Sequence, residues 1–299
     1  PNNMPVYETR GASSVIASNS EAIQTRPQLP TPSLGRFALL GMTESATPLP
    51  NPTRLLILGG TSEASALAAA VAGRADIAPT FSLAGRTTSP KPAPIASRIG
   101  GFGGVEGLCE YLSCNAIDAV VDATHPFAEQ ISNHAANACA AARVPLLVFT
   151  RPPWRREPGD DWIEVDSVEA AVDALGPERR TVLLTQGRLQ LAAFTRAPHR
   201  YVVRAIDRPA EIDALPGAKL ILARGPFALA DEERLMREEG IELLVTKNSG
   251  GAATYPKIEA ARRLGVTVVV MRRPTGPSAE TATDLSAALA WIEAHRPAP

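Results

Sequence analysis

Apolar and polar positions follow two alternating periods along the chain from residue 54 onward. Short apolar runs lie within 55–60, 77–86, 116–127 and 145–151. These runs are continuous rather than alternating, which is typical of strands buried on both faces of a parallel sheet. The stretches between them carry apolar residues at helical spacing, so the pattern predicts helices that connect the strands.

The same alternation starts again after a break at 152–177. Further strands and helices are predicted within 181–194, 200–206, 219–225, 228–240, 241–251, 255–265, 266–274 and 284–295. Right-handed crossovers place the carboxyl ends of parallel strands along one edge of each sheet. The pattern therefore predicts an α/β protein with two parallel-sheet units and a ligand-binding cleft between them.

Residues 1–52 differ from the rest of the chain. They are rich in Pro, Ser, Thr and Asn and have little apolar periodicity. Such a segment cannot bury enough apolar surface to offset its ordering entropy, so we expect a disordered N-terminal extension. The predicted organisation is then an extension at 1–52, a first domain at 53–151 and a second domain at 152–299.

Composition and charge narrow the class of protein. The 299 residues include 30 Lys and Arg against 31 Asp and Glu, a formal net charge of -1. That balance attracts neither nucleic acid nor an anionic membrane, and no apolar run reaches the ~18–20 residues of a membrane span. The three cysteines lack metal-ligand or disulfide spacing, so we expect no metal site. These features favour a cytoplasmic protein that binds a small molecule.

The first candidate site is the turn at 59–62, between the first predicted strand and helix. Gly59 and Gly60 would let a pyrophosphate approach the backbone, and Thr61 or Ser62 would cap the helix whose amino end favours an anion. The spacing differs from GxGxxG, and no GK[ST] follows. A plain tight turn between strand and helix is the alternative interpretation.

The second candidate site ends the second predicted strand at Arg86 and Thr87. In a dinucleotide-binding fold this position faces the adenosine ribose, where an acidic residue selects NAD and an Arg accommodates a 2′-phosphate. Asp and Glu are absent from 81–90. The sequence therefore predicts NADPH rather than NADH, with a solvated surface arginine as the alternative.

The third candidate site lies at 122–132. Thr124 and His125 stand where a strand becomes a helix, and Pro126 suits the first helical turn. Amides there could hold an anion or a ribose, and His125 or Asp122 could contact reacting groups. Helix capping alone would also explain Thr124 and Pro126.

The fourth candidate site is in the second unit, where strand ends carry cations beside glycines. Several cations at one sheet edge would suit a polyanionic ligand, and solvated charges are the alternative. The residues concerned are Gln186, Gly187, Arg188, Arg204, Arg224, Lys247, Asn248, Ser249, Gly250 and Gly251.

Taken together, these motifs resemble those of the precorrin-6A reductase family. The resemblance covers about 55–291 and depends on ILGGTSEA, LAGRT, GGFGGVEGL, DATHPFA and TKNSGG followed by KIEAARRLGV, in the family's order. It implies NADPH-dependent reduction of precorrin-6A to precorrin-6B in cobalamin biosynthesis. It also implies two Rossmann-like domains with the ligands between them.

The resemblance also implies roles for individual residues. The cofactor phosphates would meet Gly59, Gly60, Thr61, Ser62 and Glu63, and the 2′-phosphate would meet Arg86 and Thr87. The nicotinamide side would be lined by Thr124, His125, Pro126 and Phe127. The anionic, tetrapyrrole-derived substrate would contact Gln186, Gly187, Arg188, Lys247, Asn248, Ser249 and Gly250. The family motif often has Asp at the position of Asn248, which argues against an obligatory acid or base there.

We expect direct hydride transfer to the conjugated ring, with the protein supplying position and charge complementarity. The candidates for a proton donor are His125, Lys247 and Tyr255, and the sequence does not choose among them. Three alternatives stay open: reduction of cobalt-precorrin-6A, reduction of another conjugated small molecule, or non-catalytic sensing of NADP.

Overall fold

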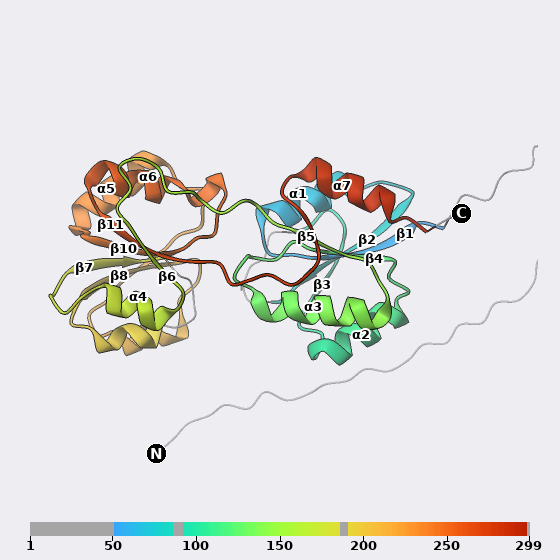
Figure 1. Ribbon diagram of the computed structural model, residues 1–299, viewed down its shortest axis with the longest axis horizontal. Coiled ribbons are helices and arrows are strands. Elements are labelled where there is room, and N and C mark those ends of the chain that lie inside the picture. Colours follow the sequence, from blue (N-terminus) through green and yellow to red (C-terminus); the bar gives the residue numbers. More distant parts are fainter. Residues whose placement is uncertain (1–50, 86–91, 186–190, 298–299) are drawn as a thin grey trace, which may run out of the picture. The chain divides into compact units, whose positions relative to one another are not determined.

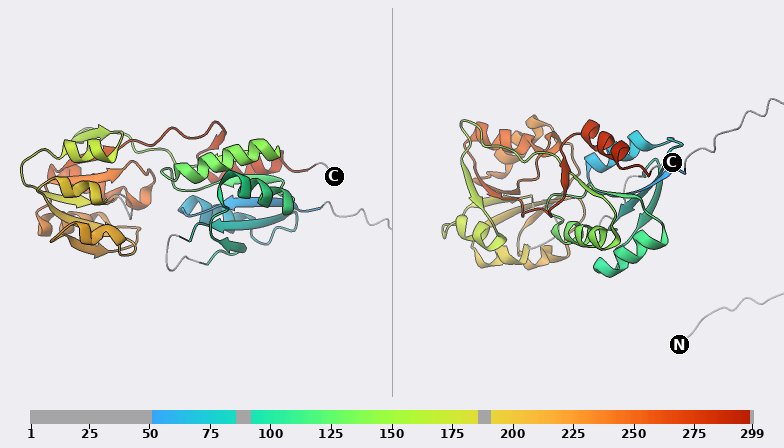
Figure 2. Two further views of the ribbon diagram at one scale, coloured as in Figure 1. Left: turned by 90° about the horizontal axis from the view of Figure 1, so that it is seen from below. Right: turned by 45° about the vertical axis from the view of Figure 1, so that its right-hand side comes forward.

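The computed structural model describes residues 51–85, 92–185 and 191–297 (Figure 1). The extension predicted at 1–52 lies outside the described residues except for its last two positions. The described chain contains two six-stranded sheets with helices on both faces (Figures 1 and 2). The predicted α/β class with two parallel sheets is confirmed.

The first sheet has the strand order β12-β5-β4-β1-β2-β3, and every adjacent pair is parallel. Its strands are β1 (Thr53–Leu58), β2 (Ile77–Leu83), β3 (Ala96–Ile99), β4 (Ala119–Asp122), β5 (Leu146–Phe149) and β12 (Glu280–Ala282). The central strands β1 and β4 are buried on both faces, as their continuous apolar runs predict. The pattern missed β3 because the side chains of this edge strand are mostly exposed.

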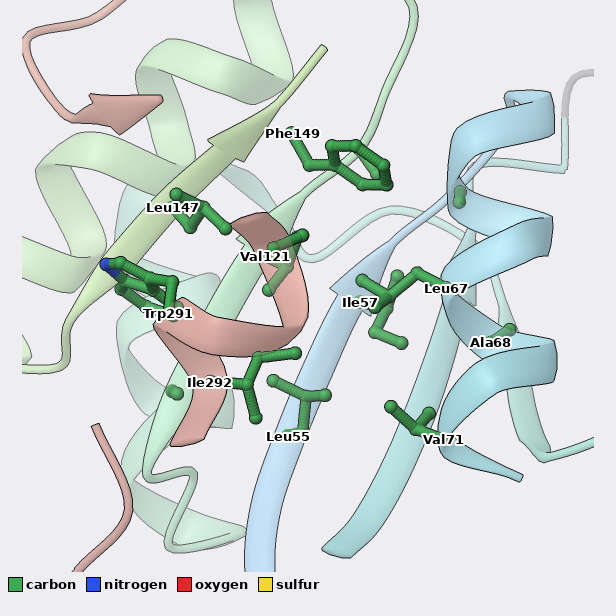
Figure 3. Packing of buried hydrophobic residues seen from close by; sticks show 14 of the residues in the cluster. Leu55, Ile57, Leu67, Ala68, Val71, Val121, Leu147, Phe149, Trp291 and Ile292 are labelled. Atoms are coloured by element: carbon green, nitrogen blue, oxygen red, sulfur yellow. The ribbon is translucent and has the colours of Figure 1, made fainter. Parts of the chain in front are cut away.

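Two helices pack on each face of the first sheet. Leu67 and Val71 of α1 (Ser62–Val71) and Trp291 of α7 (Leu285–Ala294) share one core with β1, β4 and β5. Figure 3 shows Leu67 beside Ile57 of β1, Ile292 of α7 beside Leu55, and Trp291 beside Leu147 of β5. On the opposite face, α2 (Gly104–Cys114) and α3 (Glu129–Ala142) pack over Leu56 and Leu58, so alternate residues of β1 supply both cores.

The second sheet has the order β6-β11-β10-β7-β8-β9 and is also parallel. Its strands are β6 (Trp162–Val165), β7 (Thr181–Leu184), β8 (Arg200–Ala205), β9 (Lys219–Leu222), β10 (Leu243–Lys247) and β11 (Thr267–Met271). One face is covered by α4 (Val168–Ala174) and the 3-10 helices η1 (Leu191–Arg196) and η2 (Ala210–Ala214). The other face is covered by α5 (Leu229–Glu239) and α6 (Pro256–Leu264), with η3 (Ala252–Thr254) preceding α6.

Part of the predicted break at 152–177 is regular structure. β6 pairs with β11, and α4 is capped by Ser167, whose side chain accepts from Ala170 N at 3.0 Å. Both β6 and α4 were missed because each is short, and the residues before β6 are rich in Pro and charge.

The carboxyl-terminal strand and helix belong to the first sheet. β12 pairs in parallel with β5, and Trp291 and Ile292 of α7 are buried in the core of the first sheet. The sequence interpretation assigned 152–299 to the second domain, and for 280–294 the structure corrects it. The pattern did not predict β12, which is only three residues long, and it predicted the last helix without indicating which sheet the helix covers.

Within the described ranges, no helix is both long enough and apolar enough to cross a membrane.

Candidate functional site

The turn between β1 and α1 opens into a cavity. Gly60 has a φ of +130°, and a Cβ built on it would meet no atom of the described residues within 4 Å. Gly59 is glycine for another reason, since its Cβ would lie 2.4 Å from the Phe81 ring. Thr61 Oγ1 accepts from Ala64 N at 3.1 Å and donates to Ala123 O at 2.7 Å. The turn thus brings backbone amides at a helix amino end to the cavity, which suits an anion.

Glu63, in the first turn of α1, forms an ion pair with Arg151, which follows β5. Glu63 Oε2 and Arg151 Nη1 are 2.6 Å apart, and both side chains are mostly buried. Burial would raise the pKa of Glu63, but hydrogen bonding to its own backbone amide and the charge of Arg151 hold that pKa below its usual range. Arg151 Nε also donates to Ser249 O at 2.8 Å, so this arginine connects α1 to the turn after β10.

His125 lies in the turn between β4 and α3. Its Nδ1 accepts from Phe127 N at 3.2 Å, so we assign the ring proton to Nε2. Burial, together with the nearby charges of Arg151 and Lys247, lowers the pKa of His125 to about 4. The ring is therefore neutral near pH 7, where it can donate one hydrogen bond from Nε2 but is not a cationic acid.

The other residues of this turn are held by local contacts. Asp122 Oδ1 accepts from Thr124 N at 3.0 Å, and the Thr124 and Ser132 hydroxyls lie 3.3 Å apart. Phe127 packs against a core of the second sheet, and Lys247 Nζ lies 5.1 Å from its ring centroid. The structure thus brings together Phe127, in the turn after β4 of the first sheet, and Lys247, at the end of β10 in the second.

The turn after β10 is packed against the chain that follows β5. Asn248 Oδ1 accepts from Trp154 N at 2.8 Å, and Asn248 Nδ2 donates to Trp154 O at 3.0 Å. A Cβ on Gly250 would lie 2.1 Å from Pro152 O. The Asn248 side chain, which is buried, therefore holds the connection between the sheets, and its predicted contact with substrate stays a prediction.

Arg273, which follows β11, reinforces the same packing. Its guanidinium donates to three carbonyl oxygens, those of Asn248, Arg151 and Ser249, at 2.8, 2.8 and 2.9 Å. Burial lowers its pKa to about 10, with a further contribution from the charge of Arg151. Arg273 thereby ties both chain segments that connect the two sheets to the turn after β10.

Tyr255, a candidate proton donor, lies in a different network. Its hydroxyl donates to Glu157 Oε1 at 2.7 Å and accepts from Arg262 Nη2 at 2.6 Å. Arg262 in turn contacts Asp160 through Nε at 2.8 Å. Because Tyr255 lines neither cavity described below, its predicted catalytic role gains no support from its surroundings.

Two cavities share His125 as a lining residue. The first has a volume of about 190 Å³ and combines the turn after β1 with Arg151 and the segment 250–254. It is lined by Gly60, Thr61, Ser62, Glu63, His125, Arg151, Gly250, Gly251, Ala252, Ala253 and Thr254. The second has a volume of about 210 Å³ and lies at the carboxyl ends of β4 and β5.

Several predicted site residues cannot be placed in this geometry. Arg86 and Thr87 lie outside the described residues, as do Gln186, Gly187 and Arg188. Among the residues that are described, no group of three or more His, Cys, Asp or Glu could hold a metal ion.

Sequence reasoning missed Arg151 and Arg273, which organise the first cavity and the turn after β10. Each follows an apolar strand, β5 or β11, at its carboxyl end, and that position was the available signal. Their partners are backbone carbonyls and a distant carboxylate, which no local pattern predicts.

A scan against family models matches residues 54–293 to "Precorrin-6x reductase CbiJ/CobK". A "Precorrin-6A reductase" of Sinorhizobium sp is 48% identical over 247 residues, which are 82% of this chain and 94% of that protein. A protein of the same name from Rhodococcus erythropolis is 47% identical over 80% of this chain and 97% of its own length.

Among solved structures, "CobK precorrin-6A reductase" is similar over 83% of this chain and 98% of that chain. The TM-score is 0.78 at 43% sequence identity. The similarity therefore extends across both sheets and is not limited to one of them.

Proposed function

Because the chain belongs to the precorrin-6x reductase family, we propose that it reduces precorrin-6A to precorrin-6B with NADPH as the hydride donor. The family match over 54–293, which spans both sheets, is the observation that carries this proposal. In the reaction a hydride and a proton add to the conjugated macrocycle, and NADPH becomes NADP. A cytoplasmic location stays a prediction.

The cofactor phosphates would lie in the first cavity. Gly60 leaves space for a close approach, and the amino end of α1 offers amides to an anion. Arg151 would add a donor to a phosphate through Nη2, because its contacts with Glu63 and Ser249 use Nη1 and Nε. When bound, NADPH would supply a hydride from its nicotinamide ring.

The substrate would be attracted by cations around the two cavities. Precorrin-6A carries many carboxylates on an apolar ring, and Arg151, Lys247 and Arg273 all influence the pKa of His125. Their charges would complement those carboxylates even where the hydrogen-bonding groups are already engaged. We therefore assign substrate attraction to this group of cations rather than to the Asn248 side chain.

His125 would act as a neutral hydrogen-bond donor. Its Nε2 proton can orient a polar group of either ligand, whereas its pKa of about 4 leaves almost no imidazolium at neutral pH. If the protein supplies a proton, Lys247 and Tyr255 remain the candidates: neither lines either cavity, and the Lys247 ammonium lies 5.1 Å from the ring centroid of Phe127, in the turn that carries His125.

The test of this function is anaerobic oxidation of NADPH with enzymatically prepared precorrin-6A. We expect loss of the nicotinamide absorbance coupled to a change in the macrocycle spectrum. A parallel reaction with cobalt-precorrin-6A tests the metallated alternative. Binding of NADPH without turnover of either ring would favour an NADP-sensing protein and contradict the proposed activity.

The preference for NADPH over NADH is tested at Arg86. The substitution Arg86→Ala should weaken NADPH binding about tenfold or more by removing a partner of the 2′-phosphate, and should leave NADH binding nearly unchanged. An equal loss for both nucleotides would overturn the assignment of Arg86 to the 2′-phosphate.

A further inference from the structure

Two connecting segments join the sheets. The first, 150–161, leads from β5 to β6, and the second, 272–279, leads from β11 to β12. The proposed cofactor phosphates lie at the turn after β1, whereas Lys247 and Arg273, which would attract the substrate, end or follow strands of the second sheet. A displacement of about 1 Å between reacting atoms can lower a rate about 100-fold. The connecting segments therefore influence hydride transfer, because they help to set the position of one sheet relative to the other.

Trp154 fixes the first connecting segment to the second sheet. Its backbone N–H and C=O both bind the Asn248 side chain, and its indole Nε1 donates to Gly251 O at 2.9 Å. Its ring centroid lies 6.2 Å from that of Tyr255, and Lys257 Nζ lies 4.8 Å from it. The side chain is buried in a core of the second sheet. Backbone and side chain of Trp154 thus both belong to the packing of the second sheet.

The first connecting segment leaves the first sheet abruptly. Thr150 N donates to Ala282 O at 3.0 Å, a bond between the ends of β5 and β12 within the first sheet. The next residue, Arg151, accepts through its carbonyl oxygen from Arg273 Nη1 at 2.8 Å. The two residues between Arg151 and Trp154 are prolines, whose rings fix φ and stiffen the chain. The segment therefore passes from one sheet to the other between Thr150 and Arg151.

Arg273 fixes the start of the second connecting segment to the same turn. Its guanidinium donates to Asn248 O and Ser249 O, after β10, at 2.8 and 2.9 Å. The residues 274–279 that follow lie outside helices and strands. Within the described ranges, no backbone–backbone hydrogen bond joins them to another part of the chain. Rotation between the sheets is therefore easiest at the end of β5 and within 274–279.

We propose that Trp154 is a positioning residue for hydride transfer, because it fixes the first connecting segment on the second sheet and confines rotation between the sheets to 150–151 and 274–279. This inference depends on the proposed function. Trp154 lines neither cavity, so it acts through the connecting segment and not by contact with a ligand. Without this anchor the first sheet samples more orientations, and fewer of them bring the nicotinamide to the macrocycle.

The variant Trp154→Leu tests the inference, because it removes both the indole N–H and the aromatic ring. Stopped-flow absorbance would follow NADPH oxidation in a single turnover with enzymatically prepared precorrin-6A, and calorimetry would measure the affinity for NADPH. We expect the single-turnover rate per folded protein to fall about 10- to 100-fold, and NADPH affinity to change by no more than about twofold. A residue that served stability alone would lower the melting temperature without changing that rate.

The matched control is Trp162→Leu, in the same core of the second sheet. Trp162 is 7% exposed, close to the 8% of Trp154, but its indole nitrogen has no hydrogen-bond partner among the described residues. This variant should lower the melting temperature and leave the single-turnover rate unchanged. An unchanged rate in Trp154→Leu, or equal losses of rate in both variants, would overturn the positioning role. If the unaltered protein does not turn over precorrin-6A, the proposed function itself fails and this inference with it, and that result is distinct from the other two.

A milder variant, Trp154→Phe, guards against a failure of Trp154→Leu to fold. It keeps an aromatic ring beside Tyr255 and Lys257 but removes the N–H that donates to Gly251 O. The single-turnover rate should fall about three- to fivefold, with NADPH affinity unchanged. If Trp154→Leu does not fold, an unchanged rate in Trp154→Phe would overturn the positioning role.

The orientation of the sheets can also be measured without substrate. Nitroxide labels introduced by Glu106→Cys in α2 and Glu238→Cys in α5, both exposed positions, would report the distance between the sheets by pulsed dipolar spectroscopy. The three native cysteines would first be replaced by serine. The distance distribution should be broader with Trp154→Leu than with Trp162→Leu or neither change, and equal widths in all three proteins would overturn the proposal.

Discussion

Two of the glycine pairs, Gly59-Gly60 and Gly250-Gly251, follow apolar strands and precede helices, yet their surroundings differ. A Cβ on Gly60 would project into open space beside the first cavity, whereas a Cβ on Gly250 would collide with Pro152 O. Glycine thus leaves open space beside the first cavity after β1, and it permits close packing of the backbone after β10. A glycine pair after an apolar strand can therefore reflect two different physical requirements.

The same two regions also differ in the charged side chains that they bury. After β1, α1 buries only apolar residues, and Glu63 faces the first cavity. After β10, α6 buries Lys257, whose Nζ lies 4.8 Å from the Trp154 ring centroid, near the buried ion pair of Arg204 and Glu232. The first region is the proposed ligand site, whereas the second holds the connecting segments in place.

Gly250→Ala should have the largest effect on the free energy of unfolding. The new Cβ would meet Pro152 O at 2.1 Å in a residue whose φ is +69°, so the backbone must shift. We expect a loss of ~3–5 kcal/mol in the free energy of unfolding, measured by urea denaturation. The control Gly265→Ala should lower the free energy of unfolding by only ~1 kcal/mol. Gly265 also has a positive φ, +66°, but its Cβ would meet no described atom within 4 Å. Equal losses in the two variants would contradict the packing role.

Asn248→Ala should have the next largest effect on stability. It leaves the N–H and C=O of Trp154 without their side-chain partner in a buried site, which should destabilise the protein by ~2–3 kcal/mol. The control Asn115→Ala removes a hydrogen bond to an exposed carbonyl and should lose no more than ~1 kcal/mol. Normal stability combined with weak substrate binding in Asn248→Ala would instead restore the predicted ligand role.

Lys257→Met should change how stability depends on pH. Burial, and then the charge of Arg204, lowers the pKa of Lys257 from 10.5 to about 7. Between these values the unfolded chain binds a proton that the folded chain releases, so stability rises with pH by up to ~1.4 kcal/mol per unit. Urea unfolding at pH 7 and 9 should show that the free energy of unfolding rises less between these pH values in Lys257→Met than in the unaltered protein. The control Lys219→Met, at an exposed lysine, should keep the original slope.

Gly60→Ala should have the smallest effect on stability and a clear effect on the cofactor. Its strained φ should lower the free energy of unfolding by only ~1–2 kcal/mol, because its Cβ would meet no described atom. The methyl group would project toward the expected phosphates and weaken NADPH binding about tenfold. The control Gly73→Ala, at the other end of α1, should leave the affinity unchanged, and an equal loss there would remove Gly60 from the phosphate site.

Most of the fold could be predicted from the sequence, because continuous apolar runs are the requirement of strands buried on both faces. The strands β3, β6 and β12 and the helix α4 were missed because they are short, and β3 is also exposed, so they have little apolar pattern of their own. Gly60, Glu63 and His125 were also predicted for the site, and the structure places all three around the first cavity.

The sequence by itself determined the alternation of strands and helices, the turn after β1 and the resemblance to precorrin-6A reductases, because each depends on residues close together along the chain. Only the tertiary structure decided that β12 returns to the first sheet, that Arg151 and Arg273 bind carbonyls of the turn after β10, and that Asn248 holds Trp154. These are contacts between segments far apart in sequence. Their partners are largely backbone groups, which every residue carries and which therefore leave no pattern in the amino-acid sequence.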